Sequence, residues 1–162
     1  MVRNCQELGI SLQKICSRLL NNDNLVKLLY YPGLDPLNQR DLTEEEKKKH
    51  IFNELIRVVP LLETREDERS VIVVYIPQAK RLTTNEEFRA VTIAIEVLVP
   101  PTQWLIKDSN LRPFAILGAI QESLNGKNIN GLGTIEGGDF ELINTTKEIT
   151  NYKQVFRITE YD

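Results

Sequence analysis

The stretch from Val91 to Val99 constrains the fold more than any other part of the sequence. Branched apolar residues occupy every second position, and Thr92, Ala94, Glu96 and Leu98 lie between them. A period of two places successive side chains on opposite faces of a β-strand. The stretch is therefore predicted to be a strand with one face in the core, ended by Pro100 and Pro101.

A second strand is predicted just before this one. Val71–Ile76 is a continuous apolar run, rich in β-branched residues and bounded by Pro77, which is typical of a buried strand. The polar segment Pro77–Glu87 is predicted to be an exposed loop between the two strands. Because a loop and not a helix joins them, the two strands are expected to pair antiparallel.

The C-terminal part is predicted to contain one helix and several shorter strands. Pro113 suits the start of a helix, and Gly126 suits its C-terminal cap. The predicted buried stripe of this helix is Ile116, Leu117, Ile120 and Leu124. The predicted strands are Trp104–Ile106, then Leu132–Ile135 and Phe140–Ile143 joined by a turn at Gly137-Gly138-Asp139, and a last strand from Tyr152 to Ile158.

The N-terminal part is predicted to be helical. The apolar residues that share one face of a first helix are Leu8, Leu12, Ile15 and Leu19. Asp23 is predicted to cap a second helix, and Thr43 with Glu46 fits the capping box of a third. The third helix is expected to extend through Ile51, Leu55 and Val58, with the Lys47–Lys49 run on a solvated face. Cys5 and Cys16 lie about 16 Å apart along a helix, too far for a disulfide, and are expected to pack on one face as small apolar residues.

These elements predict an α+β fold, with an antiparallel or mixed β-sheet packed against helices on one face and an N-terminal helical segment. We expect a single domain over residues 1–162, mostly helical in 1–60 and β-rich in 70–162, with one helix at 113–125. The length of 162 residues suits one domain.

The overall charge and the lengths of the apolar runs argue against two classes of protein. A net charge of −3 and a pI of about 5.4 disfavour a protein that grips nucleic acid through its phosphates. No apolar run is long enough to span a bilayer, and the N-terminus lacks the continuous apolar stretch of a secretory signal. We therefore expect a protein made in the cytoplasm, with no membrane partner.

No residue pattern indicates catalysis. His50 is the single histidine, and no orienting group accompanies it in the sequence. The glycines from Gly126 to Gly138 follow a predicted helix and lack the Gly-Lys-Ser or Gly-Lys-Thr ending of a phosphate loop. The acidic pair Glu86-Glu87 lies in a charged loop with no apolar setting to separate the two pKa values. The chain is therefore predicted not to be an enzyme and to need no cofactor or metal.

The order of elements in the C-terminal half resembles the tail terminator and tail-completion proteins of tailed bacteriophages, or a related head–tail neck protein. The strand Thr92–Pro100 leads to Trp104, and Arg112-Pro113 opens a helix that ends at Leu124-Asn125-Gly126. The hairpin after Gly131-Leu132-Gly133 and the closing strand to Asp162 complete the resemblance. The segment Asn24–Tyr31 is also similar to neck and connector proteins of phages that infect Gram-positive hosts.

This resemblance implies a virion structural protein of the tail or neck, made in the host cytoplasm. It implies a homo-oligomer, a hexameric ring that caps the tail tube and joins it to connector or stopper proteins. DNA would pass through the lumen without specific binding. The sheet edges and the segments Glu63–Arg69 and Pro77–Glu87 are the expected places for contacts with neighbours. The candidate contact residues are Arg65, Arg69, Arg81, Glu86, Glu87 and Trp104.

Two other classes of function stay open from the sequence. One is a small cytoplasmic enzyme or ligand-binding α+β domain, because such folds host many functions. The other is a regulatory nucleic-acid binder, which the acidic pI disfavours. Trp104 itself has two interpretations, as an anchor for a partner or as a core residue.

Overall fold

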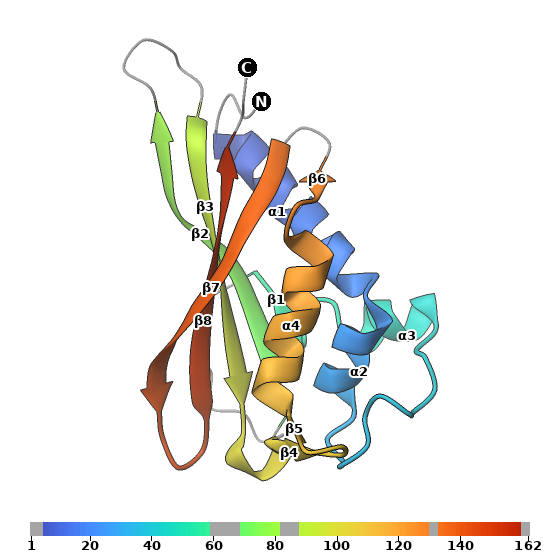
Figure 1. The fold of residues 1–162 in the computed structure, drawn as a ribbon. Helices are drawn as coiled ribbons and strands as arrows, with labels where there is room; N and C mark the ends of the chain where they lie inside the picture. Colours follow the sequence, from blue (N-terminus) through green and yellow to red (C-terminus); the bar gives the residue numbers. More distant parts are fainter. Residues whose placement is uncertain (1–4, 59–68, 82–87, 130–132, 160–162) are drawn as a thin grey trace.

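The chain folds into a curled β-sheet with its helices on one face, as seen in the computed structural model (Figure 1). The structure describes residues 5–58, 69–81, 88–129 and 133–159. The sheet has six strands in the order β1-β2-β3-β8-β7-β6. A small two-stranded sheet of β4 (Leu105–Ile106) and β5 (Asn110–Leu111) lies at one end. The predicted α+β class, with helices on one face, is confirmed.

Each long strand is antiparallel to its neighbours among the long strands. β2 (Val71–Arg81) pairs with β3 (Phe88–Val99), β3 pairs with β8 (Thr150–Thr159), and β8 pairs with β7 (Gly133–Thr145). Short strands flank this set at both ends. β1 (Ile56–Arg57) is parallel to β2, so the sheet is mixed, and β6 (Asn128–Ile129) pairs with the start of β7.

The core lies between the sheet and three helices. These are α1 (Cys5–Leu20), α2 (Asp23–Tyr30) and α4 (Arg112–Leu124), and α4 contacts both β3 and β7. The predicted stripe of α4 is buried, and the alternating apolar residues of β3 face it from the sheet. The other face of β3 was expected to be exposed, but Ala94 and Leu98 on that face are also buried.

A buried arginine joins these helices to the small sheet. Arg112, the first residue of α4, is 0% exposed and donates to four backbone carbonyls. Its Nη1 reaches the carbonyls of Leu28 and Tyr31 at 2.5 and 2.9 Å, at the C-terminus of α2. Its Nη2 reaches Gly33 at 2.6 Å, and its Nε reaches Gln103 at 2.8 Å. Burial lowers the pKa of the guanidinium to about 10, so the group stays charged at neutral pH. The negative end of the α2 dipole and the carbonyl oxygens replace the water that the cation lost.

The first turn of α2 differs from the prediction. Asn22, and not Asp23, is the N-cap, and its Oδ1 accepts from the backbone N–H of Leu25 at 3.1 Å. The Asn22 amide nitrogen also donates to the carbonyl of Ala119 and to the hydroxyl of Ser123 on α4. An aspartate has no donor for these two bonds, which is the physical reason that the cap is an asparagine.

The third helix, α3 (Glu44–His50), starts as predicted and ends earlier. The capping box is present, because Thr43 Oγ1 accepts from Glu46 N–H at 3.2 Å while a Glu46 oxygen accepts from Thr43 N–H at 2.8 Å. The predicted continuation past Ile51 is wrong. The chain turns there, with Asn53 at a φ of 62°, and enters β1. Ile51 and Leu55 are nevertheless buried in the core.

The lysine run on α3 is not uniformly solvated. Lys48 and Lys49 are exposed, but Lys47 is only 4% exposed. Its ammonium lies 2.8 Å from an Asp23 carboxylate oxygen and 3.5 Å from one of Glu44, which explains how the charge tolerates burial.

The strand β2 was predicted to end before Pro77, but it continues to Arg81. A register shift between Tyr75 and Gln78 accommodates the proline at an irregularity in the ladder. Proline is tolerated in a sheet at such irregularities and on strands whose N–H faces outward. The rest of the predicted loop, 82–87, and most of the charged segment Glu63–Arg69 lie outside the described residues.

The predicted hairpin at Gly137-Gly138-Asp139 is wrong, because β7 runs unbroken from Gly133 to Thr145. The glycines form a bulge in that strand, with a register shift between Gly137 and Asp139. Gly137 has a φ of +126°, and a Cβ there would lie 2.8 Å from the Val155 carbonyl oxygen. Only glycine fits this close approach. The observed hairpin joins β7 to β8 instead.

The two cysteines do not share one buried face, as was expected. Both are free thiols, but Cys16 is buried and Cys5 is exposed. Burial raises the pKa of the Cys16 thiol to about 12.

Candidate functional site

The strand β7 carries exposed apolar side chains at an edge of the described sheet. β6 pairs with β7 at Gly133 and Thr134, and the N–H of Gly137 donates to the Asn125 side chain at 3.1 Å. Beyond this point β7 continues as the outermost strand of the described sheet. Its exposed apolar side chains are Phe140 (48% exposed), Leu142 (54%) and Ile143 (46%).

An aromatic cluster connects this edge to α4 and the small sheet. It consists of Phe114, Phe140, Tyr152 and Trp104, from α4, β7, β8 and the residue before β4. The Phe114 ring centroid lies 5.9 Å from that of Phe140 and 5.6 Å from that of Tyr152. Phe114 is itself 40% exposed, and Leu105, which follows Trp104 in the sequence, is 68% exposed. The cluster therefore presents apolar surface to solvent.

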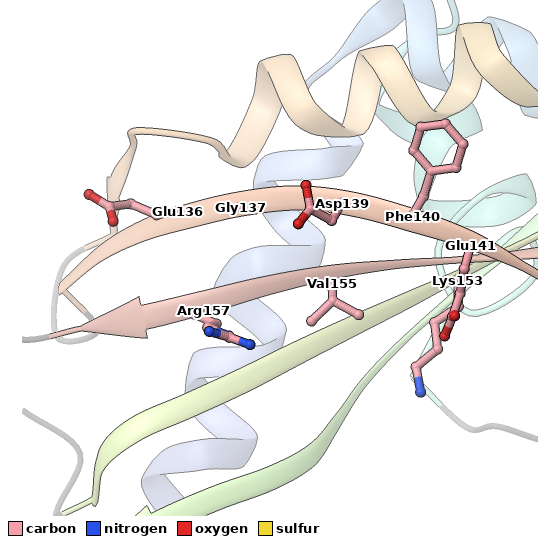
Figure 2. Close-up of a pocket in the computed structure, with 8 residues that line it drawn as sticks. All are labelled: Glu136, Gly137, Asp139, Phe140, Glu141, Lys153, Val155 and Arg157. Atoms are coloured by element: carbon pink, nitrogen blue, oxygen red, sulfur yellow. The ribbon is translucent and has the colours of Figure 1, made fainter.

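The opposite side of β7 carries charge (Figure 2). We call the face of the sheet turned away from the helices the outer face. Phe140 points toward α4, whereas Glu141 and Lys153 point to the outer face. The cross-strand pairs there are Glu136 with Arg157, Asp139 with Val155 and Glu141 with Lys153. These residues surround a shallow hollow in which acidic side chains come from β7 and basic ones from β8.

The bulge at Gly137 decides which side chains reach which face. A bulge adds one residue to a strand, and a shift of one residue exchanges the two faces. Glu136 lies on the outer face before the bulge, and Asp139 and Glu141 lie on it afterwards. The bulge is held against α4, because Gln154 Nε2 donates to the Gly138 carbonyl at 3.1 Å and to that of Leu117 at 3.3 Å.

The outer face continues across β8 and β3 with a hydrogen-bonded network. Glu96 accepts from the Asn151 amide nitrogen at 2.7 Å and pairs across the strands with Lys153. Burial, and a hydrogen bond to Glu96, raise the pKa of Tyr75 to about 12. These contacts join β2, β3 and β8 on the outer face.

The candidate contact residues that the structure describes lie at two ends of the sheet. Ser70 Oγ donates to the Gln103 side chain at 2.9 Å, which joins the residue after Arg69 to the residue before Trp104. The Arg69 guanidinium lies 5.0 Å from the centre of the Tyr30 ring. Arg81 ends β2, ten residues after Val71 and so roughly 30 Å away along the strand. Arg65, Glu86 and Glu87 lie outside the described residues.

Of the two interpretations of Trp104, the structure supports a place at the edge of the core, and its role as an anchor for a partner stays a prediction. Trp104 is half-buried and packs against the core, with its ring centroid 6.3 Å from that of Tyr152. Its Nε1 is buried, and no hydrogen-bond partner for it is present in the described part of the chain. Trp104 therefore packs the aromatic cluster against the core, while the next residue, Leu105, is exposed.

Sequence reasoning placed Phe140 and Leu142 in a strand but did not identify them, or Phe114 of α4, as candidate contact residues. The alternation of Phe140 and Leu142 with the charged Glu141 indicated that both apolar side chains lie on one face. The prediction of a turn at Gly137-Gly138 hid the continuation of this strand from Gly133, because a bulge and a turn use the same glycines.

Neither a metal centre nor a membrane span is present in the described ranges. Nowhere in them do three His, Cys, Asp or Glu side chains gather in an arrangement that could hold a metal ion. None of the described helices is long and apolar enough to cross a membrane.

The sequence matches the profile of one protein family, YomW, over residues 22–158. The match includes α2, α3, α4 and the strands from β1 to β7, with nearly all of β8. No curated protein matches the chain. The family name is of the SPbeta-prophage type, which indicates a phage-related protein. The chain belongs to the YomW family, a phage-derived family, and residues 22–158 are the part that defines this membership.

Proposed function

We propose that this chain is a structural subunit of a phage virion, a tail terminator or neck protein that forms a ring at the head–tail junction. In this role a hexameric ring caps the tail tube and joins it to the connector or stopper. Membership of a phage-derived family supports a virion role. The resemblance to tail terminators rests on the order of elements from Thr92 to the last strand, and this resemblance supports a place at the head–tail junction.

The single observation that carries the proposal is the exposed apolar edge of β7. Phe140 and Leu142 are about half exposed on the part of β7 that extends beyond β6 and is outermost in the described sheet. A long apolar edge strand promotes aggregation of a free protein unless a neighbour covers it. A subunit of a larger assembly has such a neighbour, and the edge is then an interface.

The charge of the chain supports a lumen that does not retain DNA. Each phosphate that a fixed cation holds adds a salt-dependent free energy of binding. The net charge is −3, and the outer face pairs its basic side chains with acidic ones across β7 and β8. We expect weak non-specific binding to duplex DNA at most, with a Kd no tighter than about 10⁻⁶ M at physiological salt. Fluorescence anisotropy with two unrelated duplexes measures this, and nanomolar or sequence-selective binding contradicts a passive lumen.

The proposal is tested in the phage or prophage that encodes the chain. Mass spectrometry of gradient-purified virions is expected to detect the chain at a few copies per particle, with the major capsid protein as the internal standard. A nonsense mutation in its gene is expected to give filled heads and tails that do not join. Virions that lack the chain, or a nonsense mutant that yields normal infectious particles, would overturn the proposal.

A further inference from the structure

The sheet has a second open edge, on β2, at the opposite side from β7. β1 pairs with β2 at Ile72 and Val73, near the start of the strand. The second half of β2, Gln78–Arg81, pairs with β3 on one side and has no other strand beside it in the described sheet. Figure 1 shows this half projecting with β3 beyond the helices. One molecule thus carries two strand edges that point in opposite directions across the sheet.

The two edges carry opposite charges on the same face. Gln78 pairs with Thr92, which pairs with Arg157 of the outer face, so Gln78 and Lys80 also lie on the outer face. Lys80 and Arg81 are exposed at this edge. On β7 the outer face carries the exposed acids Glu136, Asp139 and Glu141. Pairing β7 with a second β7 would bring acids together, whereas pairing β7 with β2 of another copy brings acids beside bases.

The directions of the strands agree with such a pairing. β3 is antiparallel to β2, β8 to β3, and β7 to β8, so β7 runs opposite to β2 within one molecule. A rotation about an axis roughly parallel to the strands keeps the strand direction, so β2 of the next copy placed beside β7 makes an antiparallel pair. It also keeps both outer faces on the same side of the extended sheet. Neighbouring strands lie about 4.8 Å apart, which is close enough for Lys80 to reach the carboxylate of Asp139 or Glu141.

The length of the contact is limited by two features of the edges. Pro77 lacks an N–H and lies at the register shift of β2, so the pairing segment begins after it. On β7 the regular stretch lies between the shifts at Gly137/Asp139 and Leu142/Asn144. A second shift between Lys80 and Arg81 ends the regular stretch of β2. The matched segments are therefore Gln78–Lys80 and Asp139–Glu141, with Lys80 opposite Asp139, so that residues of the outer face meet each other. On the helix face, this register sets Ala79 of the neighbouring copy beside Phe140.

We propose that the Gln78–Lys80 edge of one copy pairs antiparallel with the Asp139–Glu141 edge of the next, so that copies join head to tail through one continuous sheet. Two different surfaces of the same chain meet in this contact, which makes it heterologous, and repetition of a heterologous contact closes into a ring when the rotation allows. This contact is the interface of the proposed ring, so it rests on the proposed function.

The test uses charge reversal on the full chain and native mass spectrometry. D139K with E141K reverses the β7 edge, and K80E with R81E reverses the β2 edge. Each reversal alone is expected to abolish the wild-type ring, leaving monomers at concentrations about tenfold above those at which the wild type assembles. K48E with K49E, on the exposed side of α3, makes the same change of charge as the β2 reversal and is expected to leave the ring intact.

Mixing the two reversed proteins gives the sharpest readout. The β7-reversed protein carries basic residues at both edges, and the β2-reversed protein carries acidic residues at both edges. Neither can pair with itself, but each edge of one protein is complementary to the partner edge of the other. The mixture is therefore expected to form a ring in which the two proteins alternate in equal numbers. Combining all four substitutions in one chain restores complementarity and is expected to restore the ring. Circular dichroism of each variant confirms that its fold is retained.

Three results would overturn the inference. They are a wild-type chain that stays monomeric at every concentration, reversed variants that assemble like the wild type, and a four-substitution chain that does not recover although its fold is intact. Virion composition is measured separately. If virions contain the chain and the reversals leave assembly unchanged, the interface is wrong and the function stands. If virions lack it and the reversals act as expected, the function is wrong.

Discussion

Removing the Arg112 guanidinium is expected to destabilise the fold strongly. The side chain is fully buried and donates to the carbonyls of Leu28, Tyr31, Gly33 and Gln103. Arg112→Met keeps most of the apolar volume of the side chain and removes every donor. The four carbonyl oxygens then lose the partner that replaced their hydration, and water reaches only some of them.

The size of the expected loss in the free energy of unfolding depends on which carbonyl oxygens remain inaccessible to water. The bonds to Leu28 and Gln103 are buried, whereas those to Tyr31 and Gly33 are partly accessible. A buried acceptor left without a partner costs about 1–3 kcal/mol. Two such acceptors, with a smaller loss at the other two, give a decrease of about 4 kcal/mol in the free energy of unfolding. Arg112→Lys keeps the charge but cannot match the fork of the guanidinium, so we expect a loss of about 2 kcal/mol.

Urea unfolding followed by circular dichroism measures both losses. With a slope of about 2 kcal/mol per molar urea, a loss of about 4 kcal/mol lowers the midpoint by about 2 M. Arg157→Met removes an exposed arginine from β8 and serves as the control, with an expected change of about 0.5 kcal/mol or less. If Arg112→Met is too unstable to fold, Arg112→Lys still gives a measurable shift. A change below about 1 kcal/mol for both Arg112 variants would refute the reasoning that the carbonyls depend on this side chain.

Three further predictions concern the bulge, a helix cap and the cysteines. Gly137→Ala is expected to destabilise the fold by about 1–3 kcal/mol, because the new Cβ would lie 2.8 Å from a carbonyl oxygen in a backbone conformation that side chains disfavour. Gly9→Ala on α1 is the control: its Cβ meets nothing within 4 Å, and the substitution is expected to stabilise the fold by about 1 kcal/mol. Equal effects in chemical unfolding would show that the bulge tolerates a side chain. Thr43→Ala is expected to cost about 1 kcal/mol by removing the cap of α3, and Thr43→Ser, which keeps the hydroxyl, is expected to restore most of it in the same assay. At pH 8 a thiol reagent is expected to label the exposed Cys5 quickly and Cys16 only on unfolding, since burial raises the pKa of Cys16 to about 12 and so keeps it protonated; two equally fast reactions would contradict this.

The sequence alone was sufficient where the signal is local. The period of two in β3 needs only the residues of that strand, and the apolar stripe of α4 needs only one helix. The capping box of Thr43 and Glu46 joins residues three apart in the sequence. In each case the backbone conformation and the side chains that stabilise it lie within a few residues, so the pattern and the structure carry the same information.

The tertiary structure decided the features that depend on distant partners. Gly137-Gly138 is compatible with a turn or a bulge, and the choice follows from the pairing of β7 with β8 and from Gln154, which holds the bulge against α4. The burial of Arg112 depends on carbonyls at Leu28 and Gly33, about 80 residues earlier in the chain. The candidate interface has the same origin. A one-residue bulge exchanges the faces of a strand, so only the register with β8 places Phe140 on the helix side and Glu141 on the outer face.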